Sequence, residues 1–130
     1  MAINAYSYAK DGTKFLSKNF RVREVRCKDD TDPIFIDSDL VDVLQKVRDH
    51  FDKAVTITSA FRTASHNKKF GGATYSQHCY GKAADIKVSG VSPSRVAAYV
   101  ETLMPNSGGI GRYSTFTHVD VRATKSRWNG

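Results

Sequence analysis

The sequence predicts an α+β fold in which helices pack on a small antiparallel sheet. Two segments place apolar residues at helical spacing, and four short segments are rich in β-branched residues or alternate as strands do. Along the chain the expected order is helix, strand, strand, helix, strand, strand. This order suggests α+β architecture with an antiparallel sheet.

The two helices are expected at about residues 40–51 and 93–103. The polar pair Ser38-Asp39 precedes the first helix, whose apolar residues recur at helical spacing: Leu40, Leu44, Val47 and Phe51. Ser92 suits the N-cap of the second helix. Pro93 suits its first helical position, where a backbone N–H is not needed.

The strands are expected at four short segments, of which the last two form a hairpin: residues 54–59, 83–88, 109–113 and 117–122. Residues 60–82 are rich in Gly, Ser, Asn and His, and they predict a long functional loop with a short helix at 64–69. Gly108, Gly109 and Gly111 fit either a simple turn or a strand that lies close to substrate.

The composition indicates one domain spanning residues 1–130. A chain of this length, with 40% hydrophobic and 25% charged residues, can bury a core without disulfides. Residues 1–19 are polar, aromatic and loosely patterned, so we expect a loosely ordered N-terminal segment there. No apolar run approaches the ~20 residues that span a bilayer, and no signal-peptide core follows Met1. We therefore expect no membrane span and no export signal in this sequence.

The chain is basic, with a net charge of +7 and a pI near 9.5, which favours an anionic partner. Cell walls that carry teichoic acids or free carboxylates fit this charge, and so does nucleic acid. The basic residues are spread along the chain, without a dense arginine run or an aromatic and basic stacking motif. A specific nucleic-acid partner is therefore not expected.

The most informative stretch is SQHCYGKAAD at residues 76–85, followed by THVD at 117–120. Together they offer a metal ion two imidazoles and one carboxylate, from His78, Asp85 and His118. Three protein ligands and one open position are the arrangement of a catalytic zinc, whereas structural sites are usually closed by four ligands, often thiolates. The pattern therefore predicts metal-assisted hydrolysis.

Cys27 and Cys79 are too few to define a disulfide framework, and the sequence leaves open whether they pair. Cys79 directly follows a proposed ligand, which makes a metal role conceivable. We interpret it instead as a small, mostly buried residue, because two histidines and an aspartate already complete a catalytic set.

The stretch at residues 76–85 resembles the S-x-H-x-x-G-x-A-x-D signature of the zinc D-alanyl-D-alanine peptidases, in the hedgehog and D,D-peptidase superfamily. The segment TSAFRT at 58–63 is similar to the family's S-G-Y-R-T turn, with Ala60 and Phe61 replacing glycine and tyrosine. GGIG at 108–111 and the segment that ends in THVDVR resemble the closing strands. The resemblance covers about residues 15–123 and is closest to the branch of small zinc carboxypeptidases and phage wall-lytic enzymes.

The resemblance implies a zinc metallopeptidase that cleaves peptidoglycan stem peptides, as a D,D-carboxypeptidase or an endopeptidase of the phage endolysin kind. It places the zinc site on the sheet and the site of action in the cell wall or periplasm; we also expect a monomer. Arg62 matches the arginine of the family's turn and is expected to stabilise the oxyanion. The alternative for Arg62 is structural pairing with a carboxylate. Ser76 and Gln77 are expected to bind substrate or orient ligands.

The general base is not identified by the resemblance. Related dipeptidases have a glutamate three residues before the final zinc histidine, and some carboxypeptidases have a histidine two residues before it. This sequence has Thr115 and Phe116 at those positions. Asp120 should share a strand face with His118, so we expect it to act as base or to orient a ligand. Pairing of Asp120 with Arg122 is the structural alternative.

Two other functions stay open at this point. Without an acid or base at positions 115 and 116, the chain fits a catalytically weak, zinc-containing module that binds cell wall. A basic nucleic-acid binder would show steeply salt-dependent affinity for DNA and no metal requirement.

Overall fold

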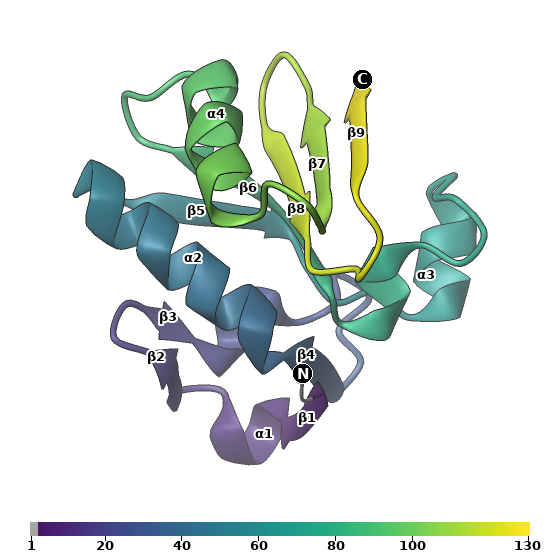
Figure 1. Cartoon of the computed structure of the whole chain (residues 1–130). Coiled ribbons are helices and arrows are strands. Elements are labelled where there is room, and N and C mark those ends of the chain that lie inside the picture. The colour runs from purple at the N-terminus through teal and green to yellow at the C-terminus, as the bar shows by residue number, and fades with distance from the viewer. Residues whose placement is uncertain (1–2) are drawn as a thin grey trace.

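The computed structural model describes residues 3–130. Its largest sheet, called the central sheet below, has five strands and lies above the N-terminal elements in Figure 1. The strands lie in the order β5-β6-β8-β7-β9, with the bounds Val55–Ser59, Ala83–Val88, Thr117–Asp120, Gly109–Arg112 and Ser126–Asn129. The first four pair antiparallel, as the sequence predicted. The last strand, β9, pairs with β7 in parallel, so the purely antiparallel expectation is corrected at this edge. Residues 121–125 connect β8 to β9 by crossing to the edge of β7 that β8 does not occupy. β9 therefore runs parallel to β7.

Helices α2, Ser38–Phe51, and α4, Pro93–Leu103, contact each other, and Figure 1 shows both on one side of the sheet. α2 begins at Ser38 rather than at about residue 40, because the Asp37 carboxylate caps it by accepting from the Asp39 N–H. The start of α4 agrees with the prediction: the Ser92 hydroxyl accepts from the Arg95 N–H and a proline occupies the first turn.

Successive side chains of a strand point to opposite faces of the central sheet, so the two faces carry different residues. Alternate residues of β6, β7 and β8 belong to the buried apolar cluster together with residues of α2 and α4; they are Ala84, Ile86, Ile110 and Val119. The residues between them, among them Asp85 and His118, lie on the opposite face. The helices therefore cover one face of the sheet and leave the other for the candidate site.

Residues 3–37 form two small sheets, where the sequence predicted a loosely ordered N-terminal segment at 1–19. The elements are β1 (Ile3–Ser7), α1 (Tyr8–Asp11), β2 (Phe15–Ser17), β3 (Phe20–Arg21), the 3₁₀ helix η1 (Val22–Val25) and β4 (Pro33–Asp37). β1 pairs antiparallel with β4, and β2 with β3. β1 is ordered by its pairing with β4, which lies far along the chain, so the sequence of residues 3–7 alone does not predict a strand there. Residues 1 and 2 lie outside the described residues.

Residues 60–82 form the predicted long loop. It contains α3, Ala64–Lys69, at the predicted place, and a 3₁₀ helix, η2, at Gln77–Tyr80. Gly81 ends η2 with a φ of +71°, and a Cβ at this position would collide with the Phe35 carbonyl oxygen. Only glycine fits both requirements, so Gly81 turns the chain between the first two proposed ligands.

One cluster of buried apolar residues extends from Phe20 to Val119 and joins the N-terminal sheets to the helices and the central sheet. Among the described helices, none has the length and apolar character needed to cross a membrane. Cys27 and Cys79, whose pairing the sequence left open, are both free thiols.

Candidate active site

The three proposed ligands meet on the face of the sheet that the helices leave free. His78 comes from η2, while Asp85 and His118 are directly paired positions of β6 and β8. His78 Nε2 lies 3.3 Å and His118 Nδ1 lies 3.1 Å from Asp85 Oδ1. One ligand atom from each residue lies within 4.8 Å of the other two, and all three side chains are buried. A single ion can therefore contact all three.

Hydrogen bonds on the far side of each imidazole determine which nitrogen faces this centre. His78 Nδ1 lies 2.7 Å from the Ala60 carbonyl oxygen, so it donates there and leaves Nε2 as an acceptor. His118 Nε2 lies 2.8 Å from Asp120 Oδ2, so it donates there and leaves Nδ1 as an acceptor. Two nitrogen lone pairs and a carboxylate oxygen thus face one another. With these tautomers three acceptors converge, and a cation between them satisfies all three; in the metal-free chain a proton on an imidazole does so. Nitrogen and oxygen ligands suit zinc.

Asp120 is fully buried, and both of its oxygens are engaged. Oδ1 accepts from the Gly109 N–H at 2.9 Å and from Arg122 Nε at 2.8 Å. Oδ2 accepts from Arg122 Nη2 at 2.6 Å and from His118. Both contacts considered from the sequence, to a ligand histidine and to Arg122, are therefore present. Because Asp120 contacts His118 on the side away from the metal centre, its position fits the orienting alternative better than direct proton transfer from water.

Burial and neighbouring charges set the protonation of the centre. Burial raises the pKa of Asp85, but hydrogen bonds from His118 and His78 outweigh it and hold that pKa well below its usual range. Burial lowers the pKa of His118, but hydrogen bonds to Asp120 and Asp85 outweigh it and raise that pKa. In the metal-free chain a proton on His118 is therefore stabilised between two carboxylates. A divalent cation would take the place of this proton.

Arg62 lies beside the centre and contacts three elements. Its Nη2 lies 3.4 Å from Asp85 Oδ2, its Nε donates to Ser59 Oγ at 3.0 Å, and its Nη1 donates to Asn67 Oδ1 at 3.2 Å. The carboxylate pairing that the sequence offered as an alternative is thus present. A guanidinium has five N–H donors, so these contacts leave two for a ligand in the cavity that Arg62 lines.

The centre opens into a cavity of about 500 Å³. Ser76 and Gln77 line it, where the sequence placed substrate contacts, and Ser76 Oγ also accepts from the His78 N–H at 3.3 Å. One part of the wall is aromatic and was not predicted from the sequence; it is formed by Tyr113, Phe116 and Trp128. The rings of Tyr113 and Phe116 stack with centroids 4.3 Å apart, and Trp128 Nε1 donates to the Tyr113 hydroxyl at 2.9 Å.

Trp128 reaches the site because Gly111 has no side chain. On β7, Gly111 is paired with His118 on one side and with Trp128 on the other. A Cβ at Gly111 would lie 2.6 Å from the indole ring, whose centroid is 4.9 Å from that of the His118 ring. Gly111 thus lies in a strand rather than in a turn, and the group that approaches it closely is the Trp128 ring; close approach of substrate stays a prediction. The sequence contained one signal for this wall: Trp128 is the only tryptophan of the chain.

Comparison with known proteins agrees with this geometry. The sequence profile of the family described as peptidase M15 matches residues 14–120, which is most of the chain. This chain belongs to the peptidase M15 family. The match confirms the resemblance noted from the sequence, and its range includes the three proposed ligands and Asp120. Arg122 and Trp128 follow the matched range, so their place in this peptidase M15 chain is known only from the structure.

A curated relative of this peptidase M15 chain is the probable peptidoglycan L,D-endopeptidase MepK of Haemophilus influenzae. The two are 34% identical over 83 residues, and the alignment covers 58% of this chain and 43% of the relative. The chain thus aligns with less than half of the length of that relative.

Proposed function

We propose that this chain is a zinc-dependent peptidase that hydrolyses peptide bonds of peptidoglycan. The observation that supports this most strongly is the convergence of His78 Nε2, Asp85 Oδ1 and His118 Nδ1 in the cavity of a peptidase M15 chain. These three atoms would hold zinc and leave one position for water or substrate. Bound zinc supplies a Lewis acid that activates water and polarises the scissile carbonyl.

The residues around the centre have separate roles in this proposal. Asp120 keeps the proton of His118 on Nε2, so that Nδ1 faces the metal position. Arg62 directs its two remaining N–H donors at the carbonyl oxygen, where negative charge develops during attack. Because the guanidinium is already held by Ser59 and Asn67, it need not reorganise during the reaction.

Proton transfer to the leaving amine requires a further group. Among the described residues that line the cavity, Asp85 is the only carboxylate, and it is a proposed ligand. The Tyr113 hydroxyl accepts from Trp128, which leaves its own proton free to point into the cavity. We therefore assign Tyr113 to hydrogen-bond the reacting peptide and to give its proton to the departing nitrogen, after which the proton released by the attacking water restores the phenol.

The substrate class follows from charge and from the relative. Arg62 and Arg122 both line the cavity of a chain with a net charge of +7, which favours peptides that carry free carboxylates, such as peptidoglycan stem peptides. The relative is named an L,D-endopeptidase, which favours an internal bond over the terminal bond of a D,D-carboxypeptidase. Ser76 and Gln77 would contact the peptide, and the chain would act as a monomer in the cell wall or periplasm, as bacterial wall enzymes and phage endolysins do.

Mass spectrometry of muropeptides released from defined cell walls, with and without a zinc chelator, tests this function. Zinc-dependent appearance of new peptide ends at an internal bond supports the endopeptidase. Release of single D-alanine residues supports the carboxypeptidase. Intact muropeptides after incubation with the zinc-loaded chain would contradict peptidase activity on this substrate.

A zinc-containing wall-binding module is the second candidate. Thr115 and Phe116 stand where relatives have an acid or base, and the carboxylate of Asp120 is fully engaged. This candidate predicts that the zinc-loaded chain sediments with insoluble walls without releasing peptides from them.

A further inference from the structure

We propose that Cys27, Asp29 and His66 form a second zinc site that ties the segment between η1 and β4 to helix α3. One ligand atom of each residue, the Cys27 Sγ, an Asp29 carboxylate oxygen and a His66 ring nitrogen, lies within 4.8 Å of the other two. None of the three lines the cavity around His78, Asp85 and His118. The site is therefore separate from the proposed catalytic centre.

Thr63 organises the three residues through its own hydrogen bonds. Its backbone N–H donates to Cys27 Sγ at 3.4 Å, and its hydroxyl donates to Asp29 Oδ2 at 2.6 Å. The same hydroxyl oxygen accepts from the His66 backbone N–H at 3.2 Å. An N–H directed at sulfur stabilises a thiolate, and a hydrogen-bonded carboxylate is oriented for ligation, so these contacts are typical of the surroundings of a metal site.

The donor set identifies the ion. Thiolate sulfur, imidazole nitrogen and carboxylate oxygen are the three ligand types of protein zinc sites. A thiolate disfavours magnesium and calcium, which bind through oxygen. Cys27 is buried, His66 is half-buried and Asp29 is exposed. The set is thus anchored in the core and opens to solvent on one side, where a water can complete a tetrahedron.

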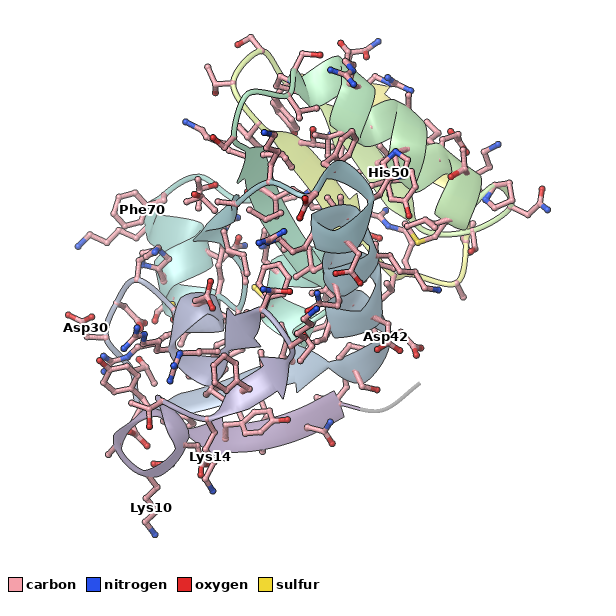
Figure 2. The ribbon with its side chains drawn as sticks, turned by 90° about the vertical axis from the view of Figure 1, so that its left-hand side faces the viewer. Lys10, Lys14, Asp30, Asp42, His50 and Phe70 are labelled. Atoms are coloured by element: carbon pink, nitrogen blue, oxygen red, sulfur yellow. The ribbon has the colours of Figure 1, made fainter. Side chains whose placement is uncertain are left out.

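The hydrogen bonds of the protein leave acceptor atoms of two of these groups available to a metal ion. The contact between Cys27 Sγ and the Thr63 hydroxyl is long, at 3.9 Å. Within residues 3–130, no protein group hydrogen-bonds a ring nitrogen of His66, whose ring packs on Phe70 with centroids 4.7 Å apart. Figure 2 shows Phe70 and Asp30, the chain neighbours of this cluster, on the same side of the molecule. A zinc ion would use the lone pairs that the protein itself leaves free.

The position of the site suggests what it does. Thr63 directly follows Arg62, and Arg62 Nη1 donates to Asn67 on α3. A metal that fixes His66 on the same helix would therefore hold the start of the loop that carries Arg62. We assign a structural role to the ion, which positions Arg62 without contacting substrate.

Zinc content and cobalt spectroscopy of the full chain test the site. We expect about two zinc equivalents in the unaltered chain and about one in Cys27→Ser, His66→Ala or Asp29→Asn. In the cobalt(II)-loaded chain we expect a sulfur-to-cobalt charge-transfer band in the near ultraviolet. The proposed catalytic centre has no thiolate, so this band reports on Cys27 alone. Cys79→Ser is the matched control, and it should keep both the band and the second equivalent.

The outcomes separate this proposal from the proposed function. The double replacement of His78 and Asp85 by alanine should lose the catalytic equivalent and keep the charge-transfer band, whereas His66→Ala should lose the band and keep the catalytic equivalent. Because Cys27 is buried, Cys27→Ser can also disturb folding. His66→Ala and Asp29→Asn test the same site at more exposed positions. An unaltered chain without a thiolate band, or a band that Cys79→Ser abolishes, would overturn the second site and leave the first untouched.

Discussion

His118 and Asp120 lie two residues apart on the same face of β8, and their side chains meet with His118 Nε2 at 2.8 Å from Asp120 Oδ2. This contact selects the tautomer in which Nδ1 of His118 faces Asp85. Arg122 and the Gly109 N–H hold the carboxylate in place from the other side. The geometry of the candidate metal centre therefore depends on a residue that does not face it.

Asp120→Asn should weaken zinc binding more than it slows the zinc-saturated enzyme. An asparagine presents an N–H₂ group either to Arg122 or to His118, where only an acceptor fits. We expect a loss of about 10- to 100-fold in zinc affinity, as for other residues that orient a ligand. Chelator competition measures the affinity, and peptide release at saturating zinc measures the rate. Full zinc affinity with a rate loss on the order of 100- to 10,000-fold would instead identify Asp120 as a direct base.

Arg62→Lys should retain zinc while kcat falls on the order of 100-fold or more. Lysine keeps the charge but cannot contact Ser59, Asn67 and Asp85 together while presenting donors to the substrate. Steady-state kinetics and zinc analysis of the same sample measure both quantities. Arg48→Lys on the surface of α2 is the matched control and should behave as the unaltered chain. A normal kcat in the folded Arg62→Lys chain would make this arginine structural.

Tyr113→Phe should lower kcat on the order of 100-fold with unchanged zinc content, because it removes the hydroxyl assigned to proton transfer. The stacking on Phe116 would be preserved. Trp128→Phe should cause a smaller loss, since it removes the N–H that orients the hydroxyl but leaves the hydroxyl itself. Tyr99→Phe, on α4, is the control for removal of a phenol elsewhere. If Tyr113→Phe turns over substrate normally, the proton must pass through water.

Replacing both His78 and Asp85 by alanine should abolish zinc binding at the proposed catalytic centre, since each single replacement removes one of three ligands and should cost about 10-fold or more in affinity. Trp128 is the only tryptophan and its ring packs near His118, so its fluorescence should change when zinc fills the centre. The double variant should lose this response while Cys27→Ser retains it. A full fluorescence response in the double variant would contradict the ligand assignment.

The metal-free chain should lose stability as pH rises through neutrality. Burial lowers the pKa of His118, but its hydrogen bonds to Asp120 and Asp85 raise it above the ordinary 6.5. A raised pKa means that the imidazolium contributes stability that is complete below the unfolded pKa and is lost as pH rises through the folded pKa. The lowered pKa values of Asp85 and Asp120 contribute stability above about 3.8 that is lost only in acid. Chelated protein should therefore show a Tm that falls as pH rises above about 6.5.

The zinc-loaded chain should not show this fall, because the ion replaces the proton on His118. The difference in Tm between loaded and chelated protein should accordingly grow with pH. His50→Asn, at the far end of α2, controls for histidine titration outside the site. A difference that shrinks as pH rises would contradict the assigned protonation.

The pattern of adjacent residues predicted the elements whose structure depends on short-range interactions. The capped helix at 93–103 and the strand at 83–88 depend on neighbouring residues, and the structure confirms them; the strand predicted at 117–122 is present but ends at Asp120. The N-terminal strands and β9 were missed because their partners lie far along the chain or across a sheet edge. These strands are ordered by pairing with distant strands, and a short stretch of sequence carries no information about that pairing.

By itself the sequence determined the chemistry available to this protein: two histidines and an aspartate in spaced motifs, an arginine after the strand at 55–59, and a basic net charge. Only the tertiary structure decided how that chemistry is arranged. The register of β6 against β8 places Asp85 opposite His118, the Ala60 carbonyl and Asp120 choose the imidazole tautomers, and Gly111 admits the indole of Trp128. The reason is physical, since side-chain identity is local, whereas register, tautomer and close approach are set by atoms that folding brings together from distant parts of the chain.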